Sequence, residues 1–267
     1  DKALAGRSEN YFKDISATPV YGKKRIVTTG GHYAYMKIAE GCDKHCTYCI
    51  IPKVRGGYRS IPMESLLKEA AELAENGVRE LILVAQETTL YGKDLYGKKS
   101  LPLLLHKLAE IPGIYWIRIL YCYPEEITEE LIAAIKAEDK VCKYLDIPIQ
   151  HASDKVLGRM GRKTSRADLE RIIGRLRAEI PEICLRTTLI TGFPGETEED
   201  HEENLAFVEE IGFDRLGVFP YSQEEDTPAA EMEDQIAEEI KEERRDDIME
   251  LQQEIAFEKA ESLVGSV

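Results

Sequence analysis

The sequence lacks the features of three broad classes of protein. No apolar run is long enough to cross a bilayer, and no signal for secretion opens the chain. The six cysteines show no framework-like spacing, which indicates reducing cytosol rather than an extracellular compartment. Lysine and arginine number 35 against 50 acidic residues, and the net charge of −15 disfavours nucleic acid and anionic membranes as partners. These absences predict a cytoplasmic protein that does not bind membranes.

The sequence has the pattern of an α/β protein. Its 267 residues, 43% of them hydrophobic, suit one large domain or a domain with an appendage. Strand-like segments alternate with helical patterns, which predicts a parallel sheet with its active site at the carboxyl ends of the strands. Six units are too few for an eight-unit barrel, and the pattern alone also allows a doubly wound sheet. The expected strands are 33–38, 81–85, 116–123, 144–149, 183–190 and 215–220, and the expected helices are 63–76, 101–110, 128–138, 165–180, 197–212 and 231–263.

Three cysteines follow the first expected strand closely. Cys42, Cys46 and Cys49 have the spacing C-x3-C-x2-C. Thiolates are soft ligands that select zinc or iron–sulfur clusters. A closed zinc site needs a fourth ligand, for which His45 or a distant residue is the candidate. Three ligands on a four-iron cluster leave one iron open for chemistry, and we favour this interpretation.

The cysteine loop, with Tyr48 directly before the last cysteine, resembles that of the radical S-adenosylmethionine (SAM) enzymes. In that family the open iron of a [4Fe–4S] cluster binds the methionine end of SAM, and an electron from the cluster cleaves the sulfonium to give a 5′-deoxyadenosyl radical. Residues 39–52 and 191–197 further resemble the methylthiotransferases, which replace a C–H bond with C–SCH3. The resemblance implies an open six-unit (β/α) barrel, a partial TIM barrel, over residues 32–230.

The methylthiotransferases have two branches. One acts on a tRNA adenosine, and the RimO-like branch acts on the β-carbon of an aspartate in a small-subunit ribosomal protein. Segments 118–124, 146–153 and 220–229 resemble the second branch. It implies a ribosomal protein as substrate, an electron donor such as flavodoxin or ferredoxin, and no direct binding of tRNA. A tRNA-modifying core and a zinc-stabilised binding module are the alternatives.

The resemblance also implies which residues hold the cofactor. Cys42, Cys46 and Cys49 would bind the cluster, and no protein acid or base is assigned. A carboxylate at Glu87 suits the ammonium of SAM. Arg186, inside an otherwise apolar strand, needs either the cofactor carboxylate or an acidic neighbour as its partner. The predicted cofactor-binding residues are Tyr48, Gln86, Glu87, Gln150, Arg186 and Gly192.

A basic segment, 155–177, follows the fourth expected strand on the active-site side. Its arginines could contact an anionic partner, or they could form the solvated face of a helix. Both interpretations stay open for Arg159 and Arg162. The predicted substrate-binding residues are Tyr121, Tyr123, Arg159, Arg162 and Tyr221.

The two ends of the chain are expected to lead to further domains. Residues 1–31 show no sustained period and are predicted to be an arm from an N-terminal domain, and 231–267 to be an acidic helix that leads to a substrate-binding domain. In the resembling family, the N-terminal domain carries three more cysteines and a second [4Fe–4S] cluster. We therefore expect this chain to cleave SAM slowly and to transfer no methylthio group.

Overall fold

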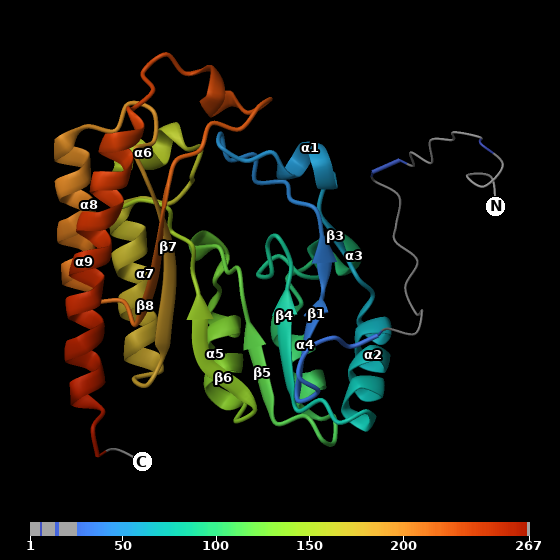
Figure 1. Ribbon diagram of the computed structural model, residues 1–267. Helices are drawn as coiled ribbons and strands as arrows, with labels where there is room; N and C mark the ends of the chain where they lie inside the picture. The colour runs from blue at the N-terminus through green and yellow to red at the C-terminus, as the bar shows by residue number, and fades with distance from the viewer. Residues whose placement is uncertain (1–5, 7–13, 16–25, 266–267) are drawn as a thin grey trace.

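A six-stranded parallel sheet organises the computed structural model, which describes residue 6, residues 14–15 and residues 26–265 (Figure 1). The strand order is β1-β4-β5-β6-β7-β8. Successive strands of this sheet are neighbours, so the order never reverses as it does in a doubly wound sheet. The predicted open six-unit barrel is confirmed. Its strands are β1 (Tyr33–Lys37), β4 (Glu80–Val84), β5 (Trp116–Ile119), β6 (Val141–Asp146), β7 (Cys184–Thr191) and β8 (Arg215–Pro220).

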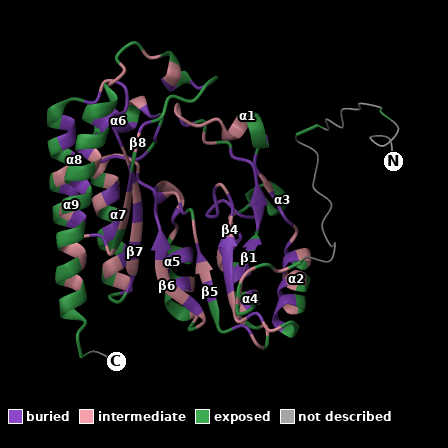
Figure 2. Ribbon diagram, viewed as in Figure 1, coloured by how far each residue is buried: buried purple, intermediate pink, exposed green. Residues whose placement is uncertain are grey.

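Helices cover the outer face of this sheet, and burial alternates along β1 and β7 (Figure 2). In β1, Ala34 and Met36 are fully buried, whereas Tyr35 on the opposite face is 44% exposed. This alternation follows from the two-residue period of a strand. None of the helices in the described part of the chain is long and apolar enough to span a membrane. The main helices are α2 (Met63–Glu75), α4 (Leu101–Ala109), α5 (Glu129–Ala137), α7 (Arg166–Glu179), α8 (Glu198–Ile211) and α9 (Glu238–Ser262).

Two expected strands differ from the observed ones by three residues or more at an end, whereas the others agree to within one residue, and both differences shape the top of the barrel. The strand expected over 116–123 ends at Ile119, because Tyr121 adopts a left-handed conformation with φ 59°. The strand expected over 144–149 begins at Val141 and ends at Asp146. Beyond it the chain stays extended as far as Gln150, which forms an isolated bridge to β7. A hydrophobic run predicts a strand but does not report where the backbone leaves the sheet.

Short elements around the carboxyl edge of the sheet were not predicted, since each is too short to show a period. The last helix also begins at Glu238 rather than at residue 231, because a 3₁₀ turn precedes it. Most of the predicted arm, 1–31, lies outside the described residues. The additional elements are β2 (Ala39–Glu40), α1 (Ile51–Arg55), β3 (Arg59–Ser60), α3 (Lys93–Tyr96), η1 (Pro124–Glu126), α6 (Asp154–Arg159) and η2 (Pro228–Glu231).

Candidate functional site

The cysteine loop leaves the sheet just after β1 and β2, at the carboxyl edge of the parallel strands (Figure 1). Cys42 and Cys46 are buried and Cys49 is partly exposed. The Cys42 amide donates to the Gly56 carbonyl over 3.2 Å, and the Cys49 amide donates to the Cys46 carbonyl over 3.0 Å. Backbone contacts therefore fix the loop before any ligand is considered.

A glycine directly before Cys42 allows this packing. Gly41 has φ +79°, and a Cβ added there would lie 2.1 Å from the Gly57 carbonyl oxygen. Its amide donates to Gln86 Oε1 over 2.8 Å. Gln86, predicted to bind the cofactor, thus holds the cysteine loop itself against the end of β4. No sequence pattern indicated this contact, because it joins residues that are 45 positions apart.

The electrostatics of the loop suit a cationic metal group. Burial, together with the charges of Cys46 and Glu87, raises the pKa of the Cys42 thiol to about 11. Burial also raises the pKa of Cys49. Iron ligands must be thiolates, so a bound iron group would supply the positive charge that stabilises the deprotonated sulfurs. Among the described residues, no three His, Cys, Asp or Glu side chains are grouped so as to hold one metal ion, and this holds for the three cysteines of the loop as well.

Glu87 is a fully buried carboxylate beside the loop. Its Oε1 accepts hydrogen bonds from the Thr89 amide, over 3.0 Å, and from the Thr89 hydroxyl. Its Oε2 has no hydrogen-bond partner in the described structure, and Lys44 Nζ lies 3.9 Å away. Burial raises the pKa of Glu87 to about 7, although the bonds from Thr89 and the charge of Lys44 act in the opposite direction. A buried oxygen without a donor fits an ammonium ligand.

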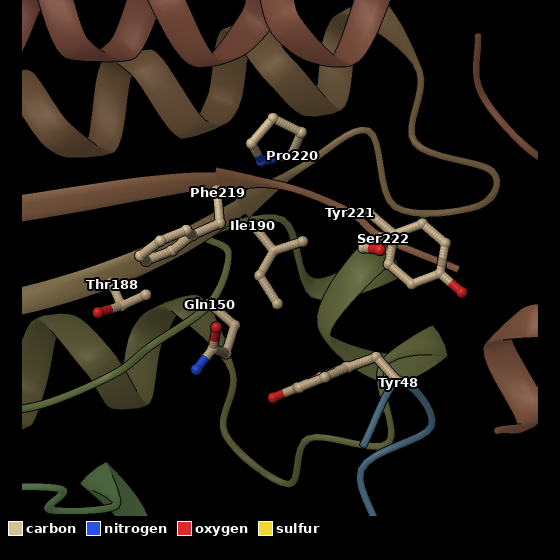
Figure 3. A pocket seen from close by; sticks show the side chains of 8 residues that line it. All are labelled: Tyr48, Gln150, Thr188, Ile190, Phe219, Pro220, Tyr221 and Ser222. Carbon is tan, nitrogen blue, oxygen red and sulfur yellow. The ribbon is translucent and has the colours of Figure 1, made fainter. Parts of the chain in front are cut away.

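A pocket of about 220 Å³ opens beside the cysteine loop. Figure 3 shows Tyr48 and Gln150 on either side of this cavity, with Phe219 and Ile190 above them. Gln150 has φ +75°, an uncommon conformation for a residue other than glycine. The backbone amide of Gln150 donates to the Thr188 carbonyl over 2.9 Å, which fixes Gln150 at the rim of β7. The pocket is lined by Tyr48, Gln150, Thr188, Ile190, Phe219, Pro220, Tyr221 and Ser222.

Two predicted cofactor-binding residues have protein partners. Arg186 Nη1 donates to Asp146 Oδ1 over 2.6 Å, so the acidic neighbour anticipated as one of its two partners is present. Gly192 has φ +67°, and a Cβ added there would lie 2.1 Å from Lys241 Cγ. The close approach that Gly192 permits is to α9.

The residues predicted to bind substrate fall into two groups. Tyr121 is 48% exposed at the barrel mouth, and Arg159 forms an ion pair with Asp234 at 2.6 Å. Arg162 and Tyr221 are only 8% and 3% exposed, so their burial does not fit contact with a protein surface. Neither of the anticipated surroundings, an anionic partner or a solvated helix face, describes Arg162.

Tyr123 lies inside the site rather than on its rim. Its hydroxyl is 3.6 Å from Cys46 Sγ, and two cations lie close to its ring. Lys44 Nζ is 4.9 Å and Arg162 Cζ is 4.3 Å from the ring centroid. Tyr123 therefore connects the cysteine loop with a basic side chain of a distant segment.

The sequence did not indicate that α9 contacts the pocket. Lys241 is 6% exposed, and its Nζ donates to the Tyr221 carbonyl over 2.9 Å. Three further residues at helical spacing, Arg244, Ile248 and Gln252, share its buried face. That spacing was the available signal, and the many acidic residues of the helix obscured it.

Comparison with known proteins agrees with this geometry. Residues 36–208 match the family model of the radical SAM superfamily. The chain is 63% identical to the ribosomal protein uS12 methylthiotransferase RimO of Lachnoclostridium phytofermentans over 99% of the chain and 60% of that protein. It is 55% identical to RimO of Alkaliphilus oremlandii over 91% of the chain and 56% of that protein. The chain thus spans 56 to 60% of the length of these two relatives.

Solved structures share the fold at low sequence identity. The radical SAM methyltransferase TsrM from Kitasatospora setae aligns with a TM-score of 0.61 and 19% identity, over 74% of this chain and 38% of that one. Coproporphyrinogen III oxidase (HemN) from Escherichia coli aligns with a TM-score of 0.60 and 21% identity, over 85% of this chain and 51% of that one. With the cysteine loop at the carboxyl edge of a six-stranded partial barrel and a family match over most of that barrel, the chain belongs to the radical SAM superfamily.

Proposed function

We propose that this chain is the radical-generating core of a methylthiotransferase that modifies an aspartate of ribosomal protein uS12. The observation that carries the proposal is the 63% identity to a uS12 methylthiotransferase over 99% of the chain. The cysteine loop, the buried Glu87 and the adjacent pocket supply a matching site. The same proposal assigns residues 32–230 to the barrel and treats 1–31 and 231–267 as connections to further domains.

The chain's own residues divide the work of holding the cofactors. Cys42, Cys46 and Cys49 would hold a [4Fe–4S] cluster, which when bound supplies the electron for reductive cleavage of SAM. Glu87 Oε2, buried without a hydrogen-bond donor among the described residues, would accept the ammonium of SAM. Tyr48 and Gln150 would place the adenosine in the pocket between them.

The other predicted residues have narrower roles in this proposal. Gln86 fixes the loop through Gly41, and Gly192 lets α9 approach the pocket. Arg186 keeps donors beyond the one that it shares with Asp146, and it lies on the same face of β7 as Thr188 and Ile190, which line the pocket, so it could receive a carboxylate there. Tyr121, exposed at the mouth, is the best placed of the predicted substrate-binding residues.

Three parts of the proposal concern partners of this chain. A second [4Fe–4S] cluster would belong to another domain, and a flavodoxin or ferredoxin would deliver the electron. The substrate would be the aspartate-bearing segment of uS12 rather than tRNA. The names of the relatives support this choice, and so does the net charge of −15, which disfavours RNA.

The test is iron and acid-labile sulfide per chain after anaerobic reconstitution, followed by SAM cleavage with dithionite. We expect one four-iron cluster per chain, formation of 5′-deoxyadenosine, and loss of both in Cys46→Ala. Zinc without visible colour would overturn the radical assignment. The substrate is tested by adding a uS12 peptide or tRNA to the reconstituted chain. Tight, salt-dependent binding of tRNA without binding of the peptide would overturn the substrate assignment.

A further inference from the structure

Arg162 is a buried arginine directly behind the cysteine loop. The segment just before it is joined to that loop, because the Thr47 amide donates to the Met160 carbonyl over 3.0 Å and the Thr47 hydroxyl donates to the Arg159 carbonyl over 2.9 Å. A Cβ added at Gly161 would lie 3.5 Å from Thr47 Cγ2. The backbone of this segment therefore fixes where the Arg162 side chain starts.

The guanidinium has few partners for a buried cation. Its Nη2 donates to the Pro148 carbonyl over 2.9 Å. Its Nε and Nη1 are buried and have no hydrogen-bond partner in the described structure. Glu125, an acid of the same region, is already bound by Lys44 at 3.3 Å and by Thr164 at 3.0 Å. No ion pair joins Arg162 to a carboxylate of the described chain, although burying an unpaired charge is costly.

The surroundings of Arg162 point to the cysteines as the counter-charge. Its Cζ lies 4.3 Å from the Tyr123 ring centroid, and the Tyr123 hydroxyl lies 3.6 Å from Cys46 Sγ. The cation and a sulfur ligand thus contact the same neutral side chain. Electrostatic attraction acts over such a distance when water is excluded.

We propose that Arg162 is the built-in counter-charge of the iron–sulfur cluster and raises its reduction potential. Three thiolates outweigh the positive charge of an oxidised four-iron core, and reduction adds a further negative charge. A buried cation therefore stabilises the reduced form more than the oxidised form, and net charge and hydrogen bonding are known determinants of cluster potential. This inference rests on the cluster of the proposed function. In this inference Arg162 acts on the cluster through its charge and does not contact the substrate.

The test is the midpoint potential of the reconstituted chain, measured without SAM by an anaerobic redox titration followed by electron paramagnetic resonance. Arg162→Gln removes the charge, Arg162→Lys keeps it, and Arg175→Gln is the matched control, an exposed arginine paired with Glu129 on the surface. We expect a more negative potential in Arg162→Gln, a smaller shift in Arg162→Lys, and no shift in the control.

Each other outcome decides the question as well. An intact cluster with an unchanged reduction potential in Arg162→Gln overturns the inference. It is overturned in the same way if that variant also binds SAM more weakly, because the arginine would then act on SAM binding and not on the cluster potential. If Arg162→Gln binds no iron, an unchanged melting temperature of the metal-free chain supports a required counter-charge. A lowered melting temperature shows a merely structural arginine and overturns the proposal. Absence of iron in the parent chain overturns the proposed function itself, which distinguishes the two failures.

Discussion

Replacing Gly41 with alanine should disrupt the cysteine loop more than an equivalent change elsewhere. The added Cβ would meet the backbone oxygens of Gly57 and Gly56 at 2.1 and 2.5 Å, and a backbone atom cannot rotate out of the way. The loop must move, which breaks the bonds of the Gly41 amide to Gln86 and of the Cys42 amide to Gly56. The change therefore acts on the position of the first cysteine.

The magnitude follows from two contributions. Holding alanine at φ +79° costs about 1 to 2 kcal/mol. Losing two hydrogen bonds adds about 1 kcal/mol each. The expected loss of unfolding free energy is therefore about 3 to 4 kcal/mol. Gly97→Ala is the matched control, because Gly97 has φ +71° but no atom within 4 Å of its added Cβ, so only the conformational cost of about 1 to 2 kcal/mol applies.

The assay combines urea denaturation of the metal-free chain with iron content after reconstitution. Gly41→Ala should lose more stability than Gly97→Ala by about 2 kcal/mol, the two hydrogen bonds, and should hold much less iron. Gly97→Ala should hold as much iron as the parent chain. Equal stability losses in the two variants, or a normal iron content in Gly41→Ala, would show that the contact at Gly57 does not constrain the loop.

Two further changes test the pocket and the buried carboxylate. Lys241→Met removes the donor that holds the Tyr221 carbonyl, so SAM should bind the reconstituted chain about tenfold more weakly, a loss of about 1.4 kcal/mol of binding free energy. Gln252 lies on the same buried face of α9 but donates to the Phe213 carbonyl, so the control Gln252→Ala should lower stability without changing SAM affinity. Equal SAM affinities in the two variants would contradict this role of Lys241. Glu87 has a folded-state pKa of about 7, above its ordinary 4.5, so between these pH values the folded metal-free chain binds more protons than the unfolded chain. Its unfolding free energy therefore falls as pH rises through this range, by about 3 kcal/mol in all. Glu87→Gln should remove that loss, and a parent chain whose urea midpoint stays constant from pH 5 to about 8 would refute the reasoning.

The chain sequence by itself determined the class of the fold, and it predicted the three metal ligands. Alternating strand and helix patterns predict a parallel sheet because parallel strands need crossover helices. The C-x3-C-x2-C spacing predicts a metal loop because it lies within one short segment. Both signals are local. They can be recognised without knowing how distant segments pack.

Only the tertiary structure decided how the rest of the site is built. Gln86 reaches Gly41, Arg186 pairs with Asp146, and Lys241 supports Tyr221, each across segments that sequence spacing does not relate. The left-handed conformation of Gln150 likewise follows from its bridge to β7 and not from its residue type. Local sequence fixes periodicity and ligand chemistry, whereas the burial and pairing of a single side chain depend on which distant backbone lies next to it.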